Sequence, residues 1–313
     1  MFEENQNQTS CTNNGTVLDT DNPGHVSILA CLVMLLVLTI VCNLCVIVKL
    51  YKNEYHKKTR TRFLLSSLAC VDICIGIIIM PVQITILFHD AASNIGLKFC
   101  DVINNLDVTL TSMSVFHLTM LTWERRVAIC NPFGYAIVCS KKRLAIVYTA
   151  GWVTVAACSF GIIMPGYQTF EAEAWKLECQ VVQPKCQFIV GIYFVVGASL
   201  ITIVFPIALV LYFNINVICY VKKTRANNNN LGGSCESLTK NRRIRVTVTI
   251  AVLTGAFLFC WLPFTVVNVL DTIDGRMVPT TLTIFTLWLG YANSAANPLL
   301  YLLMQCNKCI GRG

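Results

Sequence analysis

The sequence predicts an all-α membrane protein, a bundle of seven transmembrane helices with its N-terminus outside the cell and its C-terminus inside. Hydrophobic residues make up 55% of the 313 residues and charged residues only 13%, whereas about a quarter of a soluble domain is charged. The mean hydropathy is +0.63. We expect an extracellular, glycosylated N-terminal segment over 1–25, a transmembrane domain over 26–303 and a short cytoplasmic tail over 304–313.

Seven apolar runs are long enough to cross a bilayer, which takes about 20 residues of helix. They lie over 26–51, 63–88, 99–130, 143–165, 188–221, 244–271 and 279–303. The connections between them are short, so the chain has no room for a separate soluble domain.

Basic residues set the orientation. Of the 24 Lys and Arg residues, four (Lys98, Lys176, Lys185 and Arg276) stand apart, and all others fall in the first, third and fifth connections or the tail. Short loops rich in Lys and Arg stay in the cytoplasm. The net charge of +8 therefore reflects topology and contact with anionic lipid, and we expect no nucleic-acid partner.

Asp107 lies within an apolar stretch that runs from Val102 to Cys130. A charge at the centre of a membrane helix costs on the order of 2.5 to 3.5 kcal/mol, so such an acid is a candidate functional residue. A ligand cation is the natural complement. The alternative is a polar residue that a neighbouring helix satisfies.

Two aromatic pairs support a cation site. Trp261 and Phe264 are three residues apart, as are Trp288 and Tyr291, so each pair shares a helix face. Aromatic faces attract an ammonium group, by about 2 kcal/mol when it is desolvated. The alternative for each is ordinary packing.

Polar side chains complete the predicted pocket. Ser199 and Thr202, three residues apart, are candidates to bind a polar ligand tail, and Thr111 and Asn268 lie one turn from Asp107 and Phe264. Hydrogen bonds from these hydroxyls to their own helix carbonyls are the alternative.

Four of the 17 cysteines are expected outside the cell, Cys11, Cys100, Cys179 and Cys186. Four cysteines allow three pairings. Two more, Cys306 and Cys309, are candidate palmitoylation sites. Asn7 and Asn14 each begin a glycosylation sequon.

One landmark residue or motif occurs in each predicted span, in order along the chain. They are Asn43, Leu68-Ala69-x-x-Asp72, Cys100 with Glu124-Arg125-Arg126, Trp152, Phe205-Pro206, Cys260-Trp261-Leu262-Pro263-Phe264 and Asn297-Pro298-x-x-Tyr301. On these motifs the chain resembles the rhodopsin-like (class A) G-protein-coupled receptors.

Within that superfamily the chain resembles the aminergic branch. Asp107 follows Cys100 by seven residues, and Trp288-x-Gly290-Tyr291 matches the aminergic seventh span. The trace-amine-associated receptors are the most similar group, on Val115-Phe116-His117-Leu118, on Cys260 to Thr265 followed by Asp271, and on Asn293-Ser294.

The resemblance implies three sets of site residues. The ligand pocket is Asp107, Val108, Thr111, Ser199, Thr202, Trp261, Phe264, Thr265, Asn268, Trp288 and Tyr291. An allosteric sodium site is implied at Asp72, Ser114, Asn293 and Ser294, with oxygen ligands that suit a hard cation. G-protein coupling and switching are implied for Glu124, Arg125, Pro263, Asn297, Pro298 and Tyr301.

The resemblance also implies a Cys100–Cys186 bridge, which leaves Cys11 with Cys179 as a second bridge; a Cys179–Cys186 bridge is the competing arrangement. We expect a plasma-membrane receptor for a small amine that activates a heterotrimeric G protein, of the stimulatory or olfactory type. The alternatives are a receptor of the same fold for a non-amine odorant or a peptide, and a membrane transporter. No nucleophile elbow, phosphate loop or metal-ligand cluster indicates an enzyme, and the span over 279–303 has no lysine for a retinal Schiff base.

Overall fold

The computed structural model describes residues 18, 21–52, 60–88, 97–163, 169, 189–228, 236–273 and 278–310. The described part is helical and contains no strand. Its elements in chain order are α2 (Pro23–Lys52), α3 (Arg60–Cys74), η2 (Ile75–Ile79), α4 (Met80–Phe88), α6 (Leu97–Cys130), α7 (Tyr135–Val138), α8 (Lys141–Ile163), α10 (Ile192–Ser199), η4 (Leu200–Val204), α11 (Phe205–Asn228), α12 (Glu236–Ile273) and α13 (Thr280–Ile310).

Besides the short helix α7, the described residues form seven continuous helical rods, because α3, η2 and α4 join end to end, as do α10, η4 and α11. Within the described residues, five stretches are long and apolar enough to cross a membrane on their own, namely Pro23–Lys52, Thr61–Phe88, Lys141–Gly161, Ile192–Thr224 and Gly255–Ile273. The other two rods, α6 and α13, are more polar because they carry Asp107, Glu124, Asn293 and Asn297. The two less apolar helices, α6 and α13, are therefore the ones with the most candidate site residues.

Three helices run past their apolar cores. α11 continues to Asn228, α12 begins at Glu236 and α13 continues to Ile310. The expected boundaries at 221, 244 and 303 marked the end of the apolar composition, and a helix does not have to stop there because polar residues such as Lys and Glu also favour helix.

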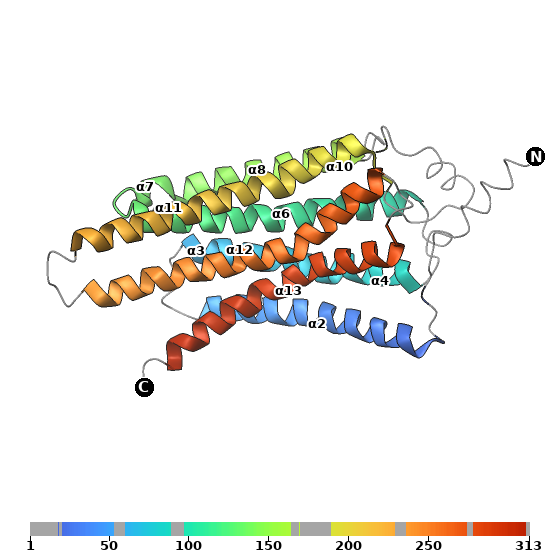
Figure 1. Ribbon diagram of the computed structural model, residues 1–313, viewed down its shortest axis with the longest axis horizontal. Helices are drawn as coiled ribbons and strands as arrows, with labels where there is room; N and C mark the ends of the chain where they lie inside the picture. Colours follow the sequence, from blue (N-terminus) through green and yellow to red (C-terminus); the bar gives the residue numbers. More distant parts are fainter. Residues whose placement is uncertain are drawn as a thin grey trace, which may run out of the picture.

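The central rod is α6. It packs against α3, α8 and α11, while α13 packs against both α12 and α2 and so closes the bundle (Figure 1). The start of α2 and the end of α13 lie at opposite ends of the molecule (Figure 1), as an odd number of spans requires. Asp107 and Arg125, on one helix, lie about 27 Å apart along its axis at 1.5 Å per residue.

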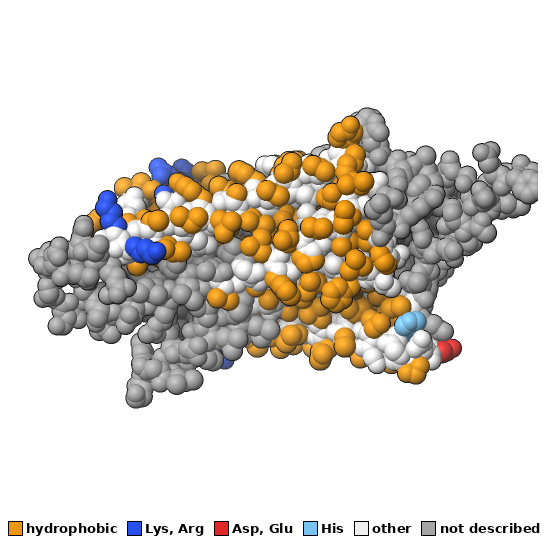
Figure 2. Space-filling model, viewed as in Figure 1, with side chains coloured by type: hydrophobic (Ala, Val, Ile, Leu, Met, Phe, Trp, Pro, Cys, Tyr) orange, Lys and Arg blue, Asp and Glu red, His pale blue; other side chains and the backbone are white. Residues whose placement is uncertain are grey.

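The surface matches a protein embedded in lipid. Figure 2 shows hydrophobic side chains over the middle of the bundle and Lys and Arg side chains gathered at the end where α7 lies. Ile201 and Phe259 are each 71% exposed, which is unfavourable in water and ordinary in a bilayer. The basic end agrees with the predicted cytoplasmic side.

Two spans contain a π turn within the residues that the structure describes. In η2 the Met80 N–H donates to the Ile75 carbonyl, and in η4 the Phe205 N–H donates to the Leu200 carbonyl. Such turns insert one residue into a helix and are frequent at functional sites. η4 directly follows Ser199, so it changes how that residue and Thr202 are placed around the helix axis.

Candidate functional site

Asp107 lies in the first third of α6 and contacts α13. The Tyr291 hydroxyl donates a hydrogen bond of 2.5 Å to Asp107 Oδ2. Asp107 Oδ1 is buried and has no hydrogen-bond partner. One carboxylate oxygen is thus held in place and the other is available, an arrangement that suits a ligand N–H⁺ donor because a buried acceptor left unpaired costs about 1 to 3 kcal/mol or more.

The predicted aromatic wall beside Asp107 forms on α13. The rings of Trp288 and Tyr291 stack edge to face with centroids 5.4 Å apart, and both are buried in one cluster with Leu110 and Met113 of α6. Packing within this cluster fixes the ring that carries the Tyr291 hydroxyl.

The second aromatic pair lies on α12. Trp261 and Phe264 contact edge to face at 6.0 Å, and Trp261 packs directly against Gly290 of α13. A Cβ atom at Gly290 would lie 3.1 Å from the Trp261 ring, so glycine allows this close contact. Trp261 therefore contacts α13 at Gly290, the residue before Tyr291, and it belongs to α12, the helix that contains Pro263.

Most of the predicted hydroxyls bond to their own helices. Thr111 donates to the Asp107 carbonyl at 2.6 Å and to the Val108 carbonyl at 3.3 Å. Thr202 and Thr265 donate to the carbonyls four residues before them, at 2.8 and 2.9 Å. In the structure these three threonines therefore follow the alternative prediction, a hydrogen bond to a carbonyl of their own helix. Ser199 and Asn268 are both half-buried.

Asp72 is the second membrane acid and is fully buried. Its Oδ1 accepts a hydrogen bond of 3.1 Å from the Ser114 hydroxyl, and its Oδ2 accepts one of 3.3 Å from the Asn297 amide. The carboxylate therefore joins α3, α6 and α13. The predicted neighbours Asn293 and Ser294 are buried as well.

The oxygen atoms around Asp72 fit a hard cation. The side-chain oxygens of Asn293 and Asn297 are buried without a hydrogen-bond partner, and amide, hydroxyl and carboxylate oxygens are the ligands that such ions prefer. Among the described residues no group of three or more His, Cys, Asp and Glu side chains could hold a metal, so this single acid with neutral oxygens differs from a transition-metal site.

Asn43 repairs the helix at Pro298. Proline has no N–H, so the Ser294 carbonyl four residues before it has no partner within α13. The Asn43 amide donates to that carbonyl at 3.0 Å and to the Thr39 carbonyl at 2.9 Å. This buried contact joins α2 to α13 next to the Asp72 network.

At the other end of α6, Glu124 is buried and Arg125 is partly exposed. Arg125 Nε lies 3.6 Å from Glu124 Oε2. Glu124 Oε1 accepts hydrogen bonds from Thr61 at 3.1 Å and from the Tyr135 hydroxyl. Three elements, α3, α6 and α7, thus hold one carboxylate that pairs with the arginine of the predicted coupling motif.

Sequence reasoning did not include Thr61 or Tyr135 in the coupling site. It named His117 only as part of a family motif and predicted none of its contacts: its Nδ1–H donates to the Met113 carbonyl at 2.5 Å and its Nε2 lies 2.8 Å from the Ser67 hydroxyl. His117 is fully buried and contacts the rings of Tyr148 and Trp152. The one available signal was the presence of a histidine inside an apolar span.

Several predicted residues lie outside the described part of the chain. Cys100 is disulfide-bonded, but Cys11, Cys179 and Cys186 fall beyond the described residues, so its pairing stays a prediction. The sequons at Asn7 and Asn14 are outside it too. α13 includes Tyr301, Cys306 and Cys309, whose side chains are not described.

Comparison with known proteins identifies the family. Residues 42–301 match the model of the 7 transmembrane receptor (rhodopsin family). The chain is 28% identical over 298 residues to the human 5-hydroxytryptamine receptor 4, and this alignment covers 90% of this chain and 76% of that receptor. It is 28% identical over 282 residues to the histamine H2 receptor of Canis lupus familiaris, with 89% and 76% covered.

A third relative is the human trace amine-associated receptor 1, 26% identical over 304 residues, which are 93% of this chain and 86% of that receptor. These similarities confirm the predicted class and agree with its aminergic branch. The match spans most of the transmembrane domain, from one residue before Asn43 to Tyr301. The chain therefore belongs to the rhodopsin family of seven-transmembrane receptors, and it is a multi-pass plasma-membrane receptor rather than an enzyme.

Proposed function

We propose that this receptor binds a small primary or tertiary amine through Asp107 and activates a heterotrimeric G protein at its Arg125 end. The observation that carries the proposal is the buried, unpartnered Oδ1 of Asp107 beside an Oδ2 that Tyr291 already holds. An ammonium group supplies both the missing hydrogen bond and the missing charge, and charge-assisted hydrogen bonds are about twice as strong as neutral ones.

The named relatives support the amine class, since they are receptors for 5-hydroxytryptamine, histamine and trace amines. The aromatic rings of Trp288 and Tyr291 supply the apolar and cation–π part of the pocket. Ser199 and Thr202 are proposed to contact the ligand's polar tail, and Thr111 is proposed to line the pocket one turn from Asp107. Each threonine hydroxyl keeps a free lone pair for the ligand while it donates to its own helix.

The proposed switch is a shift between two populations. A ligand favours the active arrangement only through its differential affinity for that state. Trp261 packs on Gly290 of α13 and lies two residues before Pro263 of α12, and α12 bends along its length (Figure 1). A ligand that alters the α13 contact can therefore change the angle of α12.

At the cytoplasmic end, the proposed inactive state keeps Arg125 against Glu124. Outward movement of α12 would open the surface that contains Arg125 to a G protein, of the stimulatory or olfactory type by resemblance. We also propose the Asp72 network as a sodium site, in which Asp72, Ser114, Asn293 and Ser294 hold the ion and the ion supplies positive charge to a fully buried carboxylate.

Matched ligand pairs test the proposed function. Membranes that contain the receptor are exposed to a panel of amines and to isosteric alcohols in which a hydroxyl replaces each amino group, and nucleotide exchange is measured on purified stimulatory and inhibitory G proteins. At least one amine should stimulate exchange while its alcohol does not. Equal activity of an amine and its alcohol would favour the non-amine receptor, and ligand uptake without nucleotide exchange would favour a transporter.

A further inference from the structure

Arg126, the third residue of the Glu124-Arg125-Arg126 motif, is a cation that takes no part in the contacts of Glu124 with Thr61, Tyr135 and Arg125. Its Nε is buried without a hydrogen-bond partner, and in the described part of the chain it forms no ion pair, because the neighbouring acid Glu124 bonds to Thr61, Tyr135 and Arg125. A guanidinium carries five N–H donors in one plane. Those of Arg126 are therefore available to an acceptor from outside.

Two aromatic rings lie near this guanidinium but accept no hydrogen bond from it. Its Cζ lies 5.9 Å from the ring centroids of both Tyr212 and Phe213 in α11. Ring faces attract the positive charge, but they offer no oxygen to the N–H groups at the edge of the plane. The two rings lie beside the Arg126 guanidinium and leave its donors open.

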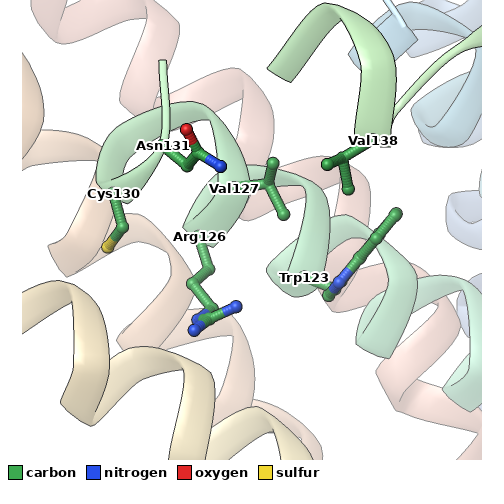
Figure 3. A pocket seen from close by; sticks show the side chains of 6 residues that line it. All are labelled: Trp123, Arg126, Val127, Cys130, Asn131 and Val138. Carbon is green, nitrogen blue, oxygen red and sulfur yellow. The ribbon is translucent and has the colours of Figure 1, made fainter. Parts of the chain in front are cut away.

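A cavity of about 270 Å³ lies beside Arg126. It is lined by Trp123, Arg126, Val127, Cys130, Asn131 and Val138. Figure 3 shows the Arg126 side chain extending from α6 on the side of α11, with Trp123 and Val138 on the other side of the cavity. Its volume is just below the roughly 300 Å³ at which small-molecule pockets begin, so it has room for a headgroup-sized anion and an adjoining apolar segment.

The position of the cavity along α6 suits the level of lipid headgroups. Arg126 is four residues from the end of α6, or about 6 Å at 1.5 Å per residue, and tryptophans such as Trp123 concentrate at the same level of a membrane. Lys and Arg side chains gather at this end (Figure 2), and basic pockets between helices on the cytoplasmic side bind anionic headgroups.

We infer that Arg126 and its cavity form a binding site for one anionic phospholipid of the inner leaflet. The lipid phosphate accepts hydrogen bonds from the Arg126 guanidinium, which suits phosphate because of its planar pair of donors. The adjoining glycerol and first methylene groups lie against Trp123, Val127 and Val138. The inference rests on the proposed orientation, which places this end in the cytoplasm, and it is independent of the amine ligand.

Native mass spectrometry of the purified, ligand-free receptor tests the site. Phosphatidylinositol and phosphatidylcholine are titrated into separate samples, and the lipids retained per receptor are counted. Wild type should retain one more phosphatidylinositol than phosphatidylcholine, and Arg126→Gln should bind that molecule at least ten-fold more weakly. Arg62→Gln is the matched control, because Arg62 also lies over a ring, that of Tyr51 at 4.1 Å, and does not line the cavity.

Val138→Trp fills the cavity and keeps the charge, so it should lose the same lipid; it also serves if Arg126→Gln does not fold. Excess inorganic phosphate should not displace the lipid, because phosphate lacks the apolar contacts. Equal retention by wild type, Arg126→Gln and Val138→Trp would overturn the site, and full displacement by phosphate would replace it with a free-anion site. Reduced G-protein activation by Arg126→Gln with unchanged lipid retention would assign Arg126 to protein docking and overturn the lipid proposal.

Discussion

The Tyr291 hydroxyl donates to Oδ2 of Asp107 over 2.5 Å and joins α13 to α6 across 184 positions of sequence. The bond orients a carboxylate whose other oxygen is buried without a partner. Because the Tyr291 ring is also packed on Trp288, the same side chain connects the proposed ligand site with the core of the bundle.

Tyr291→Phe should weaken agonist binding. The change removes only the hydroxyl and leaves Asp107 Oδ2 without its donor, and a hydrogen bond to a charged group contributes about 1.5 to 3 kcal/mol. We expect agonist affinity to fall roughly ten-fold or more, measured by radioligand competition. Tyr148→Phe is the control, because the buried Tyr148 hydroxyl has no hydrogen-bond partner; the same loss in both variants would contradict a specific role for Tyr291.

Tyr135→Phe should raise signalling without ligand. The Tyr135 hydroxyl donates to the Glu124 carboxylate that pairs with Arg125, and a hydrogen bond to a charged group contributes about 1.5 to 3 kcal/mol. The active population should increase by roughly ten-fold or more. The measurement is basal nucleotide exchange at matched surface expression, and unchanged or lower basal exchange would show that Tyr135 does not restrain Arg125.

Asp72→Asn should remove sensitivity to sodium. In wild type, sodium chloride should lower agonist affinity relative to the same concentration of a large organic cation, because an ion at Asp72 favours the arrangement in which α3, α6 and α13 meet there. Ser67→Ala changes a partly buried polar contact outside this network and should keep the sodium effect. An equal sodium effect in wild type and Asp72→Asn would exclude the site.

The disulfide prediction concerns four cysteines, of which Cys100 is already bonded. Peptide mapping without reduction should find Cys100 joined to Cys186 and Cys11 joined to Cys179. A bridge between Cys179 and Cys186, or a free thiol at Cys11, would contradict the assignment.

The helical bundle could be predicted because membrane spans can be recognised as long runs of apolar residues. Apolar runs located all seven rods, and the Lys and Arg distribution indicated their direction. Boundaries at the membrane surface could not be predicted, since α12 starts at Glu236 among residues that favour helix without being apolar. The π turns η2 and η4 also lacked a sequence signal, because the helix segments around them are apolar on all faces and show no shift in the pattern of polar residues.

The site could be predicted only where a residue's type was costly in its setting. Asp107 and Asp72 were identified because a buried acid needs a partner. Tyr291 was expected to offer its ring, whereas its hydroxyl makes the decisive contact. Thr61 and Tyr135 were not predicted because a hydroxyl in a helix costs little free energy and so gives no signal in the sequence. Only the packing shows whether it bonds to a carboxylate, as these two do, or to its own backbone, as Thr202 does.

The central claim is that Asp107 binds the ligand's ammonium group, and Asp107→Ala tests it most directly. Removing one member of a buried charge pair costs about 2 to 5 kcal/mol or more, so the potency of every amine agonist should fall at least tens-fold. Agonist concentration–response curves are measured at matched surface expression, with Asp101→Ala as the control for an exposed acid on the same helix. A large loss in Asp107→Ala alone is the predicted result, and unchanged amine potency in that variant at normal expression would contradict the account.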